Sequence, residues 1–194
     1  SNIPFSANPI RVSEQEARFA FVNALSATKL FYSVEAPTRK QYKFSDKTAI
    51  SAQTDLAIYC EAKSRICNVE FKAKGVSENR ASCFPYDKDL KKLMWEPVPG
   101  LWFQVLKSID NGSINKFLDV LYNGIHSVYT NSPEEIDSTR MSIHICVLEH
   151  GFSLHKTLYL NHQSALNQQM HIGLTVSQTE LLSISNLNGW TLFP

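Results

Sequence analysis

Two charged residues stand at alternate positions of a largely apolar segment. Glu70 and Lys72 lie within residues 66–74, whose Ile, Val and Phe content predicts a β-strand. Alternate residues of a strand point to the same face of its sheet, so Glu70 and Lys72 share one face while their neighbours turn to the other face and into the core. Burying charged groups costs free energy unless they are paired or hold a ligand, so this pair is a candidate functional site.

A carboxylate from the preceding strand completes the constellation. Asp55 opens a second strand-like run over residues 54–60, and the polar residues 61–65 between the two runs predict a hairpin. Pairing across that turn brings Asp55 close to Glu70 and Lys72. One or two carboxylates, completed by water and substrate phosphate, are the usual ligands of Mg²⁺ in proteins.

These residue types predict a Mg²⁺ or Mn²⁺ site that acts on phosphate esters. Asp55 and Glu70 would be the carboxylate ligands, and the backbone carbonyl of Phe71 would add a third oxygen. Lys72 would orient or deprotonate the attacking water, or neutralise charge on the phosphate. Neutralisation is the favoured role, because an ammonium beside a metal and two carboxylates keeps its proton. The competing interpretation is an exposed sheet face on which Glu70 and Lys72 pair with neighbouring strands.

The surrounding pattern predicts an α/β protein. Ser13 and Glu16 have the spacing of a helical capping box, and apolar residues follow them at helical spacing. The continuous apolar run 101–106 is typical of a strand in the middle of a sheet that is covered on both faces. The predicted helices are residues 13–29, 86–95 and 113–129, and the predicted strands are residues 30–36, 54–60, 66–74, 101–106, 141–148, 154–160, 172–176 and 181–184, with a short extended piece at 42–44.

Asp55, followed after a strand and a turn by Glu70-Phe71-Lys72, resembles the PD-(D/E)XK motif of restriction-endonuclease-like nucleases. Thr54 stands where the name of the motif has Pro. The stretch from Val34 to Ala73 is also similar to bacterial proteins of this superfamily. The resemblance implies a metal-dependent nuclease, acting on DNA ahead of RNA, in which Asp55 and Glu70 hold the metal and Lys72 assists the water.

The resemblance also carries an expectation for the fold. The order helix, three strands, helix, strand over residues 13–107 is similar to the αβββαβ core of restriction-endonuclease-like proteins. It implies a mixed central sheet flanked by helices, to which residues 108–194 add a C-terminal helix and further strands. The length of 194 residues predicts a single domain.

A further acid is often supplied by the first helix in this superfamily. Glu16 is the candidate here, although a role confined to the capping box is equally open. Glu35, at the end of the first predicted strand, is a second candidate for the same role.

Basic residues gather in two clusters that could contact a nucleic-acid backbone. The overall charge is nearly balanced, with 19 Lys and Arg against 18 Asp and Glu, which argues against a dedicated high-affinity nucleic-acid-binding protein but is compatible with an enzyme. Solvated surface residues are the alternative for each cluster. The candidate binding residues are Arg39, Lys40 and Lys43 in the first cluster and Lys88, Lys91 and Lys92 in the second.

Other site classes find no support in the sequence. The four cysteines form no C-x-x-C pair, the six histidines fit no metal-binding spacing, and no glycine-rich phosphate loop is present. The apolar runs are too short to cross a bilayer, and we expect a reduced, cytoplasmic protein without membrane contacts. The alternative function is a non-catalytic binding or assembly module on the same fold, in which residues 140–194 could form an oligomer interface such as that of a homodimer.

Overall fold

The computed structural model describes residues 13–42, 48–74, 87–107, 113–160 and 189–193. Short 3₁₀ helices cover Pro133–Glu135 and Leu148–His150. The α-helices are α1 (Glu14–Leu25), α2 (Asp87–Trp95) and α3 (Ser113–Asn131), and the strands are β1 (Phe31–Tyr42), β2 (Ile50–Tyr59), β3 (Arg65–Lys74), β4 (Gly100–Leu106), β5 (Arg140–Val147), β6 (Phe152–Tyr159) and β7 (Thr191–Phe193).

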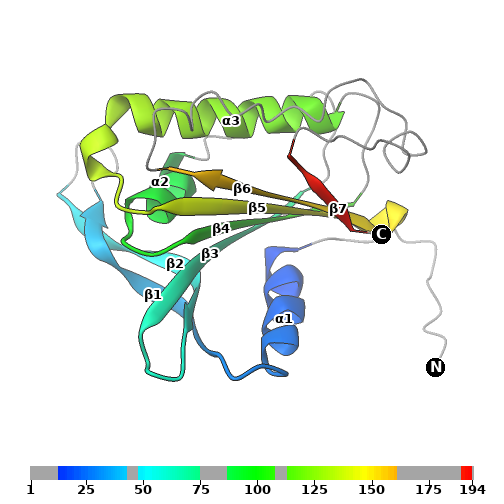
Figure 1. Cartoon of the computed structure of the whole chain (residues 1–194), viewed down its shortest axis with the longest axis horizontal. Coiled ribbons are helices and arrows are strands. Elements are labelled where there is room, and N and C mark those ends of the chain that lie inside the picture. The colour runs from blue at the N-terminus through cyan, green and yellow to red at the C-terminus, as the bar shows by residue number, and fades with distance from the viewer. Residues whose placement is uncertain (1–12, 43–47, 75–86, 108–112, 161–188, 194) are drawn as a thin grey trace.

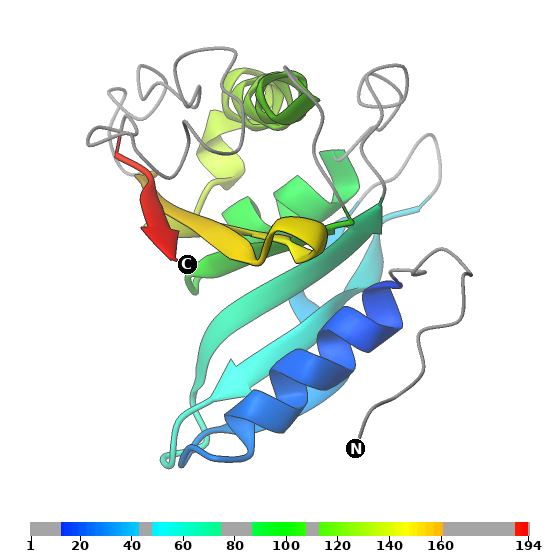
Figure 2. The ribbon, with the colours of Figure 1, turned by 90° about the vertical axis from the view of Figure 1, so that its right-hand side faces the viewer.

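These strands form one mixed sheet whose spatial order, β1 to β7, is also their order along the chain (Figure 1). Strands β1, β2 and β3 pair antiparallel on one side, β5, β6 and β7 do so on the other, and β3, β4 and β5 run parallel in the middle. Parallel neighbours need a crossover connection, which α2 and α3 provide. The two crossovers, from β3 to β4 and from β4 to β5, move in the same direction across the sheet. Right-handed crossovers of this kind place their helices on the same face, and Figure 2 shows α2 and α3 together on one face.

Helix α1 covers the opposite face, beside β2 and β3 (Figure 2). Phe21 of this helix contacts Phe71 and Phe103 edge-on, with ring centroids 5.4 and 5.3 Å apart. The larger part of the core lies between the sheet and the pair α2 and α3, and it includes the fully buried Trp102 of the central strand β4. The two faces of the sheet therefore have separate apolar layers.

The predicted α/β class is confirmed, together with the hairpin of β2 and β3 and the central position of residues 101–106. Helix α1 ends at Leu25 instead of residue 29, because the hydroxyls of Ser26 and Thr28 donate to the carbonyls of Asn23 and Leu25 and satisfy the end of the helix. Strand β1 runs on to Tyr42 instead of ending at residue 36. Strand β7 was not predicted, and the predicted strands 172–176 and 181–184 lie outside the described residues.

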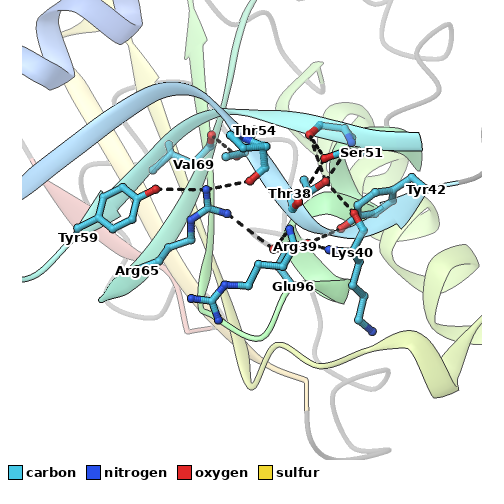
Figure 3. Close-up of polar contacts among 12 residues, drawn as sticks. Thr38, Arg39, Lys40, Tyr42, Ser51, Thr54, Tyr59, Arg65, Val69 and Glu96 are labelled. Atoms are coloured by element: carbon cyan, nitrogen blue, oxygen red, sulfur yellow. Dashed lines mark hydrogen bonds and ion pairs between the residues drawn. The ribbon is translucent and has the colours of Figure 1, made fainter. Parts of the chain in front are cut away.

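A buried carboxylate holds the irregular part of β1 (Figure 3). The register between β1 and β2 shifts midway along β1, where backbone N–H groups need acceptors other than the ladder. Glu96, directly after α2 and fully buried, accepts the N–H groups of Arg39 and Lys40 at 3.0 Å each and the hydroxyl of Tyr42 at 3.1 Å. Nη1 of Arg65 lies 3.8 Å from the same carboxylate. Glu96 therefore ties β1 to the end of α2.

Candidate active site

The strands β2 and β3 stop pairing at the position of the predicted site. The ladder between them runs from Leu56 opposite Val69 to Ile58 opposite Cys67, and its register shifts before Tyr59 near the turn. Beyond that pair, side chains make the bonds to β3: the Thr54 hydroxyl donates to the carbonyl of Val69 at 3.2 Å, and Oδ2 of Asp55 accepts the backbone N–H of Phe71 at 2.8 Å. Asp55 is therefore fixed beside the Glu70–Lys72 segment, as the hairpin register predicts.

Glu70 is fully buried on the face of β3 that is covered by α2. Its Oε2 lies 2.7 Å from Nζ of Lys92, and its Oε1 has no hydrogen-bond partner among the described residues. Burial raises the pKa of the Glu70 carboxyl above its usual range, the ammonium of Lys92 offsets part of that rise, and the nearby charge of Asp55 adds to it. A buried carboxylate oxygen without a partner is costly, so a proton, a cation or a hydrogen-bond donor would stabilise Oε1.

Lys92 completes a compact ion-pair network with α2 above the strand. Besides Glu70, its ammonium contacts Oδ1 of Asp89 at 2.8 Å and the backbone carbonyl of Gln53 at 3.1 Å. Burial by itself lowers the pKa of Lys92, but the carboxylates of Glu70 and Asp89 outweigh it and raise that pKa above its usual value. Lys92 is therefore a charged ammonium enclosed by three oxygen atoms.

Lys72 joins the two helices that flank the sheet. Its Nζ lies 3.0 Å from Oδ2 of Asp89 in α2 and 3.9 Å from Oε1 of Glu14 in α1, and its side chain is 14% exposed. Burial lowers the pKa of Lys72, but Asp89, Glu14 and Asp55 outweigh it and hold that pKa above its usual value. Lys72 therefore carries a proton at neutral pH, which suits neutralisation of a phosphate and not deprotonation of water.

A pocket of about 220 Å³ opens beside Asp55 on the α1 face. Arg18 and Glu35 form an ion pair of 3.7 Å at this pocket. Glu35 has a positive φ of 50°, a conformation that costs a residue other than glycine free energy and that often marks functional sites. The pocket is lined by Glu14, Gln15, Arg18, Glu35, Asp55 and Phe71.

In the first helix, the acid that lies at the pocket is Glu14 and not the expected Glu16. The carboxylate of Glu16 accepts the N–H and the hydroxyl of Ser13, at 3.0 and 2.9 Å, so it closes the capping box. Glu14, two residues earlier, lines the pocket and faces Lys72. Glu35, the second candidate, also lines the pocket. Sequence reasoning missed Glu14 because the capping signature drew attention to Glu16, although both acids lie in the first helical turn.

Two of the predicted phosphate-contacting lysines are paired with acidic residues of the protein. The sequence predicts a solvent-accessible Lys92, and this is wrong: it is 8% exposed and paired as described above. Nζ of Lys40 contacts Glu135 and Asp137 at 3.3 and 2.9 Å. A lysine already paired with acids has little charge left for a phosphate.

The other basic candidates lie on the surface or outside the described residues. Arg39 and Lys88 are exposed. The ammonium of Lys91 lies 5.3 Å from the ring centroid of Trp95. Lys43 lies outside the described residues.

The described residues suit a divalent cation that keeps several water ligands better than one that is held by protein ligands alone. The described residues contain no group of three or more His, Cys, Asp or Glu that could hold a metal ion. Mg²⁺ and its substitutes commonly take one or two carboxylates and fill the remaining positions with water and substrate oxygens. Asp55 together with the unpartnered Oε1 of Glu70 supplies such a donor set.

No family model matches the chain, and no curated protein or solved structure matches it. Within the parts of the chain that the structure describes, no helix has the length and apolar character needed to cross a membrane. The thiols of Cys60, Cys67 and Cys146 are free, and Cys83 lies outside the described residues.

Proposed function

We propose that this protein is a Mg²⁺- or Mn²⁺-dependent phosphodiesterase that cleaves nucleic acid, DNA ahead of RNA. The observation that carries the proposal is Glu70, a fully buried carboxylate with an oxygen that has no partner among the described residues, held beside Asp55 where β2 and β3 separate. A sheet stabilised only by cross-strand ion pairs has no need of such a group, because a buried carboxylate oxygen without a partner lowers stability.

The arrangement of elements supports a restriction-endonuclease-like fold. The chain order α1, β1, β2, β3, α2, β4 reproduces the αβββαβ order of that core, with β1 to β4 adjacent in one sheet and the two helices on opposite faces (Figure 2). Fold alone does not fix function, so the proposal rests on the side chains at the site.

Each side chain has a role in the proposed reaction. Asp55 and Glu70 hold the metal, which when bound lowers the pKa of a coordinated water and neutralises charge on the phosphate. Lys72, protonated and held between the two helices, stabilises the negative charge that grows on the phosphoryl oxygens. The acid from the first helix is Glu14 in place of Glu16, because Glu14 shares the pocket with Asp55 and faces Lys72.

The test is a cleavage assay on plasmid DNA, single-stranded DNA and RNA with Mg²⁺ or Mn²⁺. We expect Glu70→Gln and Asp55→Asn to lower the cleavage rate at least about 100-fold, because each removes a metal ligand. The matched control is Glu61→Gln on the exposed turn between β2 and β3, which should cleave at the wild-type rate. Circular dichroism must show that all variants are folded. Equal cleavage by wild type and Glu70→Gln would overturn the assignment.

A non-catalytic assembly module is the second candidate function. The edge strand β1 exposes three apolar side chains, Phe31, Tyr32 and Val34, at 57%, 45% and 43% of their surface. An exposed edge strand of this kind can pair with a second copy of the chain. Light scattering after gel filtration distinguishes the candidates when combined with Mn²⁺ titration: a dimer that takes up no metal favours the module, and metal uptake favours the enzyme.

A further inference from the structure

The ammonium of Lys92 occupies an environment made of oxygen atoms. Oε2 of Glu70 lies 2.7 Å from it, Oδ1 of Asp89 lies 2.8 Å from it, and the carbonyl oxygen of Gln53 lies 3.1 Å from it. The three oxygens come from β3, α2 and β2, so tertiary structure and not a local motif assembles them. Two carboxylates and a carbonyl are ligands that a hard metal cation prefers.

The network contains a spare acceptor and a shared acceptor. Oε1 of Glu70 is buried and has no partner in the described parts of the chain, although Oε2 of the same carboxylate is paired. Asp89 is shared, because its Oδ1 contacts Lys92 while its Oδ2 contacts Lys72 at 3.0 Å. Lys72 has a second acid within reach in Glu14, at 3.9 Å. The cations can therefore re-pair without leaving either ammonium buried alone.

We propose that Lys92 is the internal counter-ion of Glu70 and that a divalent metal displaces its ammonium when it binds between Asp55 and Glu70. The exchange rests on the proposed function, because it presumes the metal site at these two carboxylates. Lys92 keeps its proton and its contact with Asp89, and Lys72 turns toward Glu14. Glu70 is then neutralised by the metal in place of the ammonium, so the buried charge is compensated in both states.

The exchange explains why the buried carboxylate does not destabilise the metal-free protein. An isolated buried carboxylate is costly, and a partner with good geometry offsets that cost. It also sets a limit on metal affinity, because the entering ion must compete with a bound ammonium. Removal of Lys92 should therefore tighten metal binding, whereas a purely structural Lys92 would leave the affinity unchanged or weaken it.

The first measurement is the reactivity of individual lysines in the wild-type protein. Reductive methylation with and without saturating MnCl₂, read by peptide mass spectrometry, reports which ammonium groups become accessible. We expect the labelling rate of Lys92 to rise at least about fivefold with Mn²⁺, because labelling follows the population of the open side chain. Lys40, paired with Glu135 and Asp137, is the internal control and should not change. Glu70→Gln should abolish the response of Lys92.

The second measurement compares Mn²⁺ affinity in wild type and Lys92→Met by the electron paramagnetic resonance signal of free Mn²⁺. We expect about tenfold tighter binding by the variant, because a like charge next to the metal is removed. If Lys92→Met does not fold, the labelling experiment decides.

The possible results separate the exchange from the proposed function. Mn²⁺ binding by the wild type with unchanged labelling of Lys92 would overturn the exchange and leave the metal site standing. The absence of Mn²⁺ binding by both proteins would overturn both. Binding by Lys92→Met alone would overturn the exchange, because the metal would then fail to displace the ammonium in the wild type, and it would also count against metal-dependent catalysis by the wild type.

Discussion

Replacement of Glu96 by alanine should strongly destabilise the protein. The substitution removes the acceptor of two backbone N–H groups, those of Arg39 and Lys40, and of the Tyr42 hydroxyl. Glu96 is fully buried, and water does not replace it without rearrangement of β1. The side chain of Arg65, 6% exposed, loses its carboxylate neighbour at 3.8 Å at the same time.

The magnitude follows from the number and kind of bonds lost. A hydrogen bond to a charged group contributes about 1.5–3 kcal/mol, but three bonds to one carboxylate are not additive. Breaking a buried charged contact by removing one partner costs about 3–5 kcal/mol. We therefore expect Glu96→Ala to lower the free energy of unfolding by about 4 kcal/mol, a large part of the 5–15 kcal/mol that is typical of a domain.

The assay is urea unfolding, followed by tryptophan fluorescence and far-ultraviolet circular dichroism. Tyr42→Phe removes one of the three bonds and should cost about 1 kcal/mol. Glu61→Ala is the control, because its only ion pair with another described residue is a 4.0 Å contact with Lys29 and both side chains are largely exposed, so a change within about 0.5 kcal/mol is expected. A loss below about 1 kcal/mol for Glu96→Ala, with an unchanged slope against urea, would refute the role assigned to this carboxylate.

Three further substitutions test the packing around two glycines and the histidine pair on β5 and β6. Gly100→Ala should lower the free energy of unfolding by about 2–3 kcal/mol, because a Cβ there would lie 2.8 Å from the Cβ and the backbone oxygen of Leu93, and these atoms cannot move away easily. An unchanged midpoint of urea unfolding would contradict this packing. Gly124→Ala should cost clearly less, since the close neighbour among the described residues is the flexible end of the Leu90 side chain and alanine favours the helix. A loss equal to that of Gly100→Ala would count against this comparison. Burial lowers the pKa of His144 and of His155, its partner across β5 and β6, so the unfolded chain binds more protons near the ordinary histidine pKa. Stability should therefore be fully present above about pH 6.5 and fall as the pH drops below it, and His144→Phe should flatten this dependence between pH 5 and 7; the reasoning fails if the variant keeps the wild-type slope.

The sequence by itself determined the central hairpin and the placement of its charged residues. Alternation along residues 66–74 placed Glu70 and Lys72 on one face, and the polar turn between the two runs set the register that brings Asp55 to Phe71. These are local relations, because a strand has a period of two and a short turn leaves little choice of pairing. The central position of β4 followed from its continuous apolar run, because a strand that is covered on both faces needs apolar side chains on both.

Only the tertiary structure decided which charges meet at the site. Lys92 belongs to a helix whose polar residues are assigned to solvent by periodicity, yet α2 packs across β2 and β3 with this ammonium over Glu70. In the same way, the choice of Glu14 over Glu16 depends on where the first turn of α1 meets Lys72. Contacts of this kind join elements that are far apart in the sequence, and the crossover of α2 and the docking angle of α1 set them. A buried charge is stable only where such distant partners converge, so the fold and not the local sequence pattern decides which residue pairs with it.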